Sequence, residues 1–112
     1  MNRGEIWWAS MPDPHASEPG YRHPIVIVSA NYFNKSNIQT VIVAIITSNL
    51  HLADAPGNFK LTKSKSGLNR DSAVNVSQIV TLDKTFLTEK VGRLSTKQLN
   101  LLDVGLQLVL SV

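Results

Sequence analysis

An arginine and a histidine stand side by side at positions 22 and 23, between a Pro-Gly pair and a proline that leads into an apolar run. The guanidinium of arginine is a planar, charged fork that suits phosphate oxygens, and the imidazole of histidine exchanges a proton near neutral pH. Pro19-Gly20 favours a tight turn, and Pro24 forces the residue before it into extended geometry. The sequence therefore predicts a phosphate-binding group and a proton-transfer group at one stiffened strand entrance, the two functions that metal-free phosphodiester cleavage requires.

The two side chains of this pair cannot point the same way. On an extended segment, Arg22 and His23 face opposite sides, so one of them is better placed to reach a substrate. Glu18 lies on the same loop and is either an acid–base partner or the anion that orients Arg22. In the alternative, Arg22 caps a carboxylate such as that of Glu18, and His23 only packs. The spacing alone leaves both interpretations open.

A second candidate is the hydroxyl pair Thr47-Ser48, which follows an apolar run and precedes Asn49. A hydroxyl at the end of a strand can bond or orient a phosphate oxygen. The same residues also suit a turn in which the hydroxyl bonds the backbone and ends the strand. Both readings stay open at this point.

Aromatic and basic residues offer further contacts. Because successive side chains of a strand alternate, Trp7 and Trp8 cannot both face one core; one is expected outside, against a partner or a stacked base. Four basic residues fall within eleven positions with no acid between them: Lys60, Lys63, Lys65 and Arg70. This segment either rests on a polyanion or is a solvated surface.

The composition narrows the classes of function. With 112 residues, 43% of them hydrophobic, 17% charged and a net charge of +3, the chain is expected to form a single domain over residues 1–112. The absence of cysteine excludes disulfides and thiolate chemistry. The histidines (15, 23 and 51) lack zinc-site spacing, and no serine-hydrolase elbow or phosphate-cradling glycine loop occurs. Neither a metal nor another cofactor is expected.

No apolar leader precedes the first expected strand. The longest apolar run, residues 41–46, is too short to cross a bilayer as a helix. These features predict a cytoplasmic protein without a membrane contact.

The elements that must position these residues are mostly strands. Turn residues and β-branched runs predict strands over 5–10, 24–29, 40–47, 58–61, 72–76, 78–82 and 90–94. Residues 31–37 have turn chemistry. Ser95 and Gln98 match a capping box, and apolar residues at helical spacing follow them. We therefore expect a small, curled antiparallel barrel with a C-terminal helix over one opening.

Five segments in this order resemble the MazF/PemK-type toxins of bacterial toxin–antitoxin pairs: residues 3–8, 17–28, 40–48, 67–76 and 78–84. The resemblance runs nearly end to end. It implies an SH3-like antiparallel barrel of the CcdB/PemK type and a homodimer. It also implies a metal-independent endoribonuclease, an mRNA interferase, that cuts single-stranded RNA at short sequences and leaves a 2′,3′-cyclic phosphate and a 5′-hydroxyl. A cognate antitoxin, commonly a small acidic protein with a disordered tail, is the implied partner.

In this family the catalytic arginine directly precedes the loop proline and the catalytic threonine ends the third strand. Thr47 matches the threonine, whereas His23 occupies the arginine's position and Arg22 stands one residue earlier. The resulting hypothesis gives Arg22 the phosphate oxygens, Thr47 a supporting hydrogen bond, and His23 the proton transfer with help from Glu18. Further substrate contacts are expected from Tyr21, Ser48, Gln78, Lys60, Arg70 and Trp8.

Two other classes of function remain compatible with this pattern, because a fold does not determine an activity. One is a non-catalytic binding toxin of the same fold, of the gyrase-poison type, which acts through its C-terminal helix. The other is a small oligomeric RNA-binding domain without activity. Cleavage of RNA in EDTA separates both from a nuclease.

Overall fold

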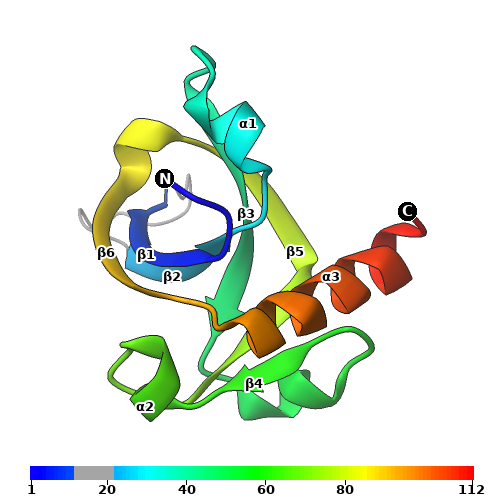
Figure 1. Ribbon diagram of the computed structural model, residues 1–112. Helices are drawn as coiled ribbons and strands as arrows, with labels where there is room; N and C mark the ends of the chain where they lie inside the picture. The colour runs from blue at the N-terminus through cyan, green and yellow to red at the C-terminus, as the bar shows by residue number, and fades with distance from the viewer. Residues whose placement is uncertain (12–21) are drawn as a thin grey trace.

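A curled antiparallel sheet of six strands dominates the computed structural model, which describes residues 1–11 and 22–112 (Figure 1). The strands are β1 (Glu5–Ser10), β2 (Arg22–Ile27), β3 (Thr40–Thr47), β4 (Phe59–Leu61), β5 (Ser72–Asp83) and β6 (Leu87–Arg93). Their order across the sheet is β4-β5-β3-β2-β1-β6, so β4 and β6 form its edges. The helices are α1 (Asn31–Lys35), α2 (Lys63–Ser66) and α3 (Thr96–Leu110), with 3₁₀ turns at η1 (Leu50–Asp54) and η2 (Lys84–Phe86). The expected mostly β half-barrel with a C-terminal helix is confirmed.

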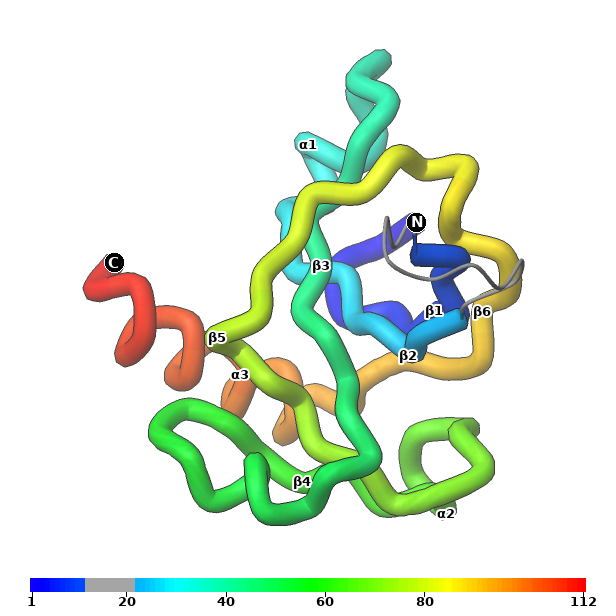
Figure 2. The backbone as a smooth tube through the Cα atoms, turned by 180° about the vertical axis from the view of Figure 1, so that it is seen from behind, coloured from blue at the N-terminus to red at the C-terminus, as the bar shows by residue number. Residues whose placement is uncertain are grey.

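One strand replaces the two that were expected over 72–82, and that expectation is wrong. β5 runs unbroken beside β3 through the centre of the molecule (Figure 2). The polar residue Ser77, which was expected to separate two strands, lies in a β-bulge. Ala44 of β3 pairs with Ile79 of β5, whereas the next residue of β3 pairs with Asn75. The Asn75 carboxamide oxygen accepts from the amide and the hydroxyl of Ser77 at 3.3 and 2.7 Å. The side chain thus supplies the partner that the interrupted ladder lacks.

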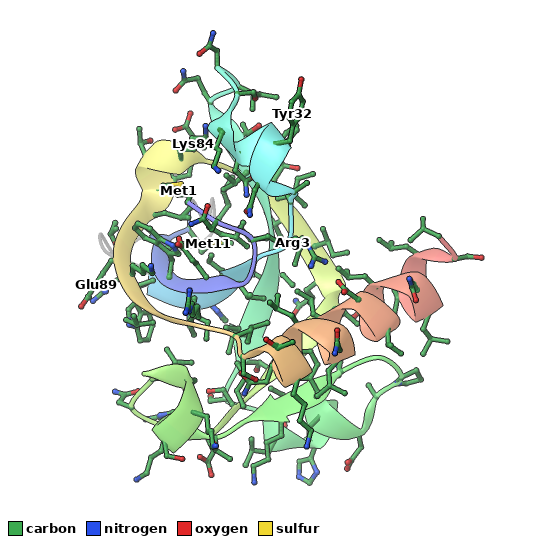
Figure 3. All side chains as sticks on the ribbon, in the orientation of Figure 1. Met1, Arg3, Met11, Tyr32, Lys84 and Glu89 are labelled. Atoms are coloured by element: carbon green, nitrogen blue, oxygen red, sulfur yellow. The ribbon has the colours of Figure 1, made fainter. Side chains whose placement is uncertain are left out.

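The other strand boundaries lie closer to those expected from the sequence. β1 and β3 match their expected ranges, β2 starts two residues before the expected start, and β6 starts at Leu87. The segment expected as a turn contains α1, whose Asn34 is buried. Lys84 ties this helix to the end of β5, because its ammonium donates to the Asn34 carbonyl at 2.8 Å (Figure 3). Tyr32 on the same helix is 91% exposed.

Apolar clusters cover both faces of the sheet, which explains the near-continuous β-branched runs of β2 and β3. Ile6, Val26 and Val74 belong to the first cluster, and α3 covers it through Leu102. Ile25, Ile27 and Val43 belong to the second cluster. Trp8 packs against the first cluster and Trp7 against the second. The two tryptophans thus lie on opposite faces, each packed against a core cluster, and Trp8 is only partly buried.

The C-terminal helix begins and packs as its sequence predicts. The Gln98 amide donates to the Ser95 hydroxyl at 3.2 Å, and the Ser95 amide donates to the Gln98 side chain at 2.8 Å, which confirms the capping box. Gly105 lies directly on Gly57: a Cβ at position 105 would stand 2.3 Å from the Gly57 carbonyl oxygen. Beyond this contact the helix projects from the body (Figure 1), and Leu108 is 61% exposed. None of the helices in the described ranges could span a bilayer.

A buried carboxylate joins β1 to β6. Glu5 accepts from the Trp7 indole at 3.0 Å and pairs with the Lys90 ammonium at 3.1 Å. Burial raises the pKa of the Glu5 carboxyl, but the hydrogen bonds from Trp7 and the Asn2 backbone, together with Lys90, outweigh burial. The pKa of Glu5 therefore lies below its usual value.

Candidate active site

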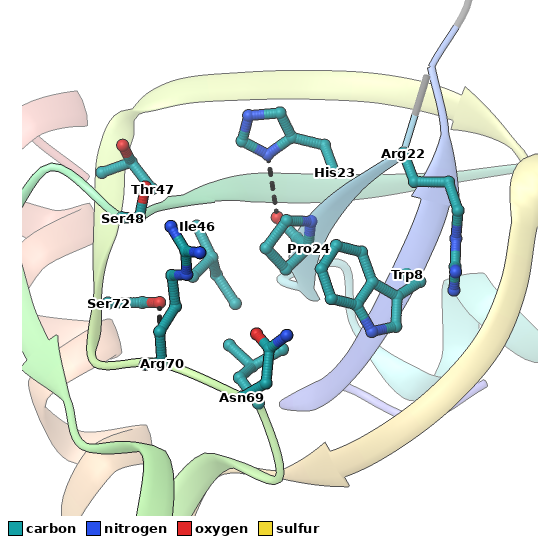
Figure 4. Close-up of a pocket in the computed structure, with 11 residues that line it drawn as sticks. Trp8, Arg22, His23, Pro24, Ile46, Thr47, Ser48, Asn69, Arg70 and Ser72 are labelled. Carbon is teal, nitrogen blue, oxygen red and sulfur yellow. Dashed lines mark hydrogen bonds between the residues drawn. The ribbon is translucent and has the colours of Figure 1, made fainter. Parts of the chain in front are cut away.

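A cavity of about 310 Å³ opens where β2 begins and β3 ends (Figure 4). Three segments form its walls: residues 22–24 with Trp8, residues 46–48, and residues 68–70 with Ser72. Two arginines, a histidine and several hydroxyl residues thus line one cavity, although they lie up to fifty positions apart in the sequence.

The cavity exists because β2 and β3 separate at this end. Their pairing covers Ile25 to Ile27 of β2, with Ile25 opposite Ile45. The same register carried two residues further would place His23 opposite Thr47, but no such pair forms. Pro24 stands between, and proline has no amide proton to donate to a ladder. The two catalytic candidates therefore face each other across an opening.

Arg22 is engaged on the far side of Trp8. Its guanidinium lies 3.0 Å from a carboxylate oxygen of Glu89 and 4.9 Å from the centre of the Trp8 ring. In Figure 4 the guanidinium points away from the end of β3. Arg22 does pair with a carboxylate, as the structural alternative predicted, and the described partner is Glu89. Glu18, the carboxylate named from sequence, lies outside the described residues.

The guanidinium of Arg70, unlike that of Arg22, points toward the end of β3 (Figure 4). Figure 4 shows its guanidinium rising from the 68–70 wall toward the side where Thr47 and Ser48 lie. Within residues 1–11 and 22–112, no carboxylate or hydrogen-bond partner holds this guanidinium. The Arg70 carbonyl accepts from the Ser72 hydroxyl at 3.2 Å, which fixes the backbone below it.

The hydroxyl of Thr47 ends β3 in a turn, and the residue also borders the cavity. Its Oγ1 accepts from the Asn49 amide at 3.1 Å, which is the turn expected at the end of the strand. The residue also lines the cavity. The turn uses the hydroxyl as an acceptor and leaves its proton available to a bound group.

His23 is half-buried at the upper edge of the cavity (Figure 4). Its Nδ1 lies 3.4 Å from the Pro24 carbonyl oxygen. A carbonyl oxygen only accepts, so this contact suits a proton on Nδ1. The other ring nitrogen, Nε2, points away from the Pro24 carbonyl.

The structure gathers some of the expected substrate contacts and not others. Trp8, Ser48 and Arg70 line the cavity. Lys60 does not, and its ammonium lies 4.0 Å from Asp71. Gln78 is also absent from the walls, because its carbonyl oxygen accepts from Asn75 at 2.8 Å beside the bulge in β5. Tyr21 lies outside the described residues.

Sequence reasoning missed two residues of this region. Asn69 lines the cavity beside Arg70. Its place after the left-handed Gly67 turn, inside a segment already matched to the family, was the available signal. Glu89 was missed because its contact with Arg22 spans 67 positions, and no local pattern reveals such a pair.

The described parts of the chain contain no group of three or more histidine, aspartate or glutamate side chains that could hold an ion.

Comparison with known proteins assigns the family. Residues 2–110 match the profile described as PemK-like, MazF-like toxin of type II toxin–antitoxin systems. The chain belongs to this family. It is 43% identical over 112 residues to endoribonuclease MazF6 of Mycobacterium tuberculosis H37Rv, which covers 100% of this chain and 98% of that protein. It is 38% identical to endoribonuclease MazF of Staphylococcus saprophyticus, over 96% of this chain and 92% of that protein. The expected MazF-type class of endoribonuclease toxins is thus confirmed.

Solved structures support the same fold. The Mycobacterium tuberculosis toxin MazF-mt6 superposes with a TM-score of 0.79 at 18% identity, over 96% of this MazF-like chain and 97% of that one. A mycobacterial endoribonuclease in complex with its cognate antitoxin gives a TM-score of 0.77 at 22% identity, over 100% and 96% of the two chains. A MazE–MazF structure from Deinococcus radiodurans gives 0.80 at 18% identity, over 100% and 96%. At these identities the likeness concerns the half-barrel fold.

Proposed function

We propose that this MazF-family toxin cuts single-stranded RNA without a metal, through attack of a ribose 2′-hydroxyl on the adjacent phosphate, within one domain spanning residues 1–112. The observation that carries the proposal is the cavity between β2 and β3. Its walls include Arg70, whose guanidinium is directed toward the end of β3 (Figure 4), together with His23, Thr47 and Arg22, whose guanidinium is held by Glu89. Such a set can neutralise a phosphate and move a proton near neutral pH.

The reaction forms one bond and breaks one. The 2′-oxygen bonds to phosphorus as its proton passes to a base, and the bond from phosphorus to the 5′-oxygen breaks as that oxygen gains a proton. The products are a 2′,3′-cyclic phosphate and a 5′-hydroxyl. His23 is the proposed proton-transfer group, with Glu18 as the second. General acid–base catalysis of this kind contributes about 10²- to 10⁴-fold.

Negative charge builds on the phosphate oxygens in the transition state. Thr47 is proposed to donate a hydrogen bond to them, and Arg22 and Arg70 supply positive charge. One preorganised donor of this kind is worth about 3–4 kcal/mol in acyl-transfer enzymes. Arg22 must first leave Glu89, and that exposed ion pair costs only about 0–1 kcal/mol to break.

The residues proposed to contact the rest of the RNA are assigned by whether they line the cavity. Trp8 offers an aromatic surface and Ser48 a hydroxyl inside the cavity, and Tyr21 is proposed to stack on a base. Lys60 and Gln78 lie outside the cavity walls, so they are assigned to nucleotides that flank the cut.

Incubation of the purified protein with end-labelled RNA in EDTA tests the reaction. We expect cleavage with cyclic-phosphate ends, and no cleavage when the single ribose 5′ of the cut is replaced by deoxyribose. Continued cutting of the deoxy substrate would exclude cyclisation. Binding of folded protein without scission would favour the two non-catalytic classes.

Variants test the assigned roles. Thr47→Val keeps the side-chain shape but removes the hydroxyl, and His23→Ala removes the imidazole; each is expected to lower kcat at least about 10²-fold. Thr81→Val is the matched control, because Thr81 is exposed on β5 away from the cavity walls. Equal activity of Thr47→Val and the control would refute the role of Thr47.

We further propose that the protein forms a homodimer and binds a cognate antitoxin, as the family resemblance implies. The exposed apolar stripe of α3, with Leu101, Val104 and Leu108, supports a protein contact at this helix. The solved complex of a mycobacterial endoribonuclease with its cognate antitoxin supports the second partner. Sedimentation equilibrium of the protein alone, and then with an acidic antitoxin peptide, measures both associations.

A further inference from the structure

We propose that Asn69 reads the edge of one RNA base next to the cut and sets the base preference at that position. This inference rests on the proposed ribonuclease function and adds a residue to which neither the sequence nor the comparisons give a role. Asn69 lines the cavity between Trp8 and Arg70, and in Figure 4 its carboxamide points into the cavity.

The carboxamide of Asn69 is available for a ligand. The side chain is exposed, and within the described ranges no hydrogen bond occupies either of its polar atoms. An asparagine amide presents one acceptor and two donors in a plane. Adenine presents a donor next to an acceptor at N6 and N7, and a bidentate contact with this edge is how asparagine distinguishes adenine from other bases.

The backbone that carries Asn69 is held on both sides. Gly67 adopts a φ of 81°, and a Cβ there would stand 2.2 Å from the Val91 carbonyl oxygen, so the turn is pressed against β6. The next residue, Leu68, is only 6% exposed and its amide donates to the Ser66 hydroxyl at 3.1 Å. After Asn69, the Ser72 hydroxyl holds the Arg70 carbonyl at 3.2 Å. A side chain that distinguishes bases needs such a fixed backbone, because a mobile amide could bond to the edge of any base.

The neighbours of Asn69 suit the rest of a nucleotide. Trp8 and Pro24 give an apolar surface beside the amide (Figure 4), which matches the flat face of a base. The Arg70 guanidinium lies on the other side, where it can hold the phosphate attached to that base. Apolar face, polar edge and phosphate therefore each meet a complementary group, and Asn69 is the one that meets the edge.

The test compares cut sites in a randomised RNA pool, sequenced after digestion in EDTA with wild type, Asn69→Ala, Asn69→Asp and Asn37→Ala. Asn37 is the matched control, an exposed asparagine beyond the opposite end of β3, whose side chain has no partner among the described residues. Loss of one bidentate base contact corresponds to about a 5- to 150-fold loss of discrimination. We expect this loss in Asn69→Ala at one nucleotide position only, with Asn37→Ala unchanged.

Asn69→Asp gives a directional result. A carboxylate offers only acceptors, so the preference at the same position should shift toward guanine, whose Watson–Crick edge presents two adjacent donors. Unchanged preference in both Asn69 variants, or a uniform loss of rate at all sites with unchanged preference, would overturn the inference. If wild-type protein leaves the whole pool uncut, the proposed function itself fails, and that outcome is distinct from cleavage with unaltered preference.

Discussion

The ion pair between Arg22 and Glu89 predicts that removing the carboxylate strengthens RNA binding. The substitution Glu89→Gln keeps the shape of the side chain and removes its charge. RNA must displace Glu89 before a phosphate can take the Arg22 guanidinium, so the free energy of that displacement is subtracted from the binding free energy. Without the carboxylate charge, displacement costs less free energy, and RNA binds more tightly.

The size of the effect follows from the geometry. At 3.0 Å the two charges attract by about 1.4 kcal/mol in bulk water. Both side chains are well exposed, at 45% and 61%, and exposed pairs retain only about 0.2–1 kcal/mol after side-chain entropy and screening. The predicted gain in affinity is therefore about 1.4- to 5-fold at low salt, and it should shrink as ionic strength rises.

Fluorescence anisotropy with an RNA that carries deoxyribose at the cut measures this affinity without turnover. Asp54→Asn is the control, because it makes the same change of charge at an exposed site outside the cavity walls. If displacement of Glu89 from Arg22 is the cause, the gain from Glu89→Gln should vanish in an Arg22→Gln background. An equal gain in that background, or from Asp54→Asn, would mean that only long-range charge acts, and the displacement argument would be refuted.

Three predictions concern stability and are measured by urea unfolding. Gly105→Ala should lower the free energy of unfolding by about 1–3 kcal/mol, because its Cβ would meet the Gly57 carbonyl oxygen at 2.3 Å; a gain of about 1 kcal/mol, as for an unhindered helix position, would contradict the close contact. Ser95→Ala should cost about 0.5–2 kcal/mol through loss of the helix cap, and no loss would mean that the cap is dispensable. Glu5→Gln should cost about 1–3 kcal/mol near pH 7. Since the pKa of Glu5 is lowered on folding, its charge stabilises the protein above the usual value of 4.5, and that stabilisation is lost as pH falls through the folded pKa. The difference between wild type and Glu5→Gln should therefore narrow below pH 4.5, and a constant difference would exclude the charge as its cause.

Features set by neighbours in the chain could be predicted from the sequence. The capping box at Ser95 and the turn at Thr47 depend on residues two or three positions away, and both form. The β-branched run of β3 indicated a strand covered on both faces, as the two clusters confirm. Such signals need no knowledge of the rest of the fold.

Features set by distant residues were beyond the same reasoning. Whether Ser77 ends a strand or forms a bulge depends on the side chain of Asn75 and on the partner strand β3. Whether Trp7 is exposed depends on a second core that forms only after the sheet curls. The same limit applies to Arg22, whose carboxylate partner lies on β6. Types of residue and local spacing located the candidate site, but the direction of its side chains required the tertiary structure.

Gly67 and Gly92 press two backbones together: a Cβ on Gly67 would strike the Val91 carbonyl at 2.2 Å, and one on Gly92 would strike the Ser66 carbonyl at 2.6 Å. The main chain at Gly67, where the 68–70 wall begins, cannot move closer to β6, because no space separates the two main chains there. On this side of the cavity the groups that can move are long side chains such as Arg70, whose rotation takes picoseconds to nanoseconds when they are exposed. Entry of a nucleotide is therefore expected to need no movement of the main chain at Gly67 toward β6.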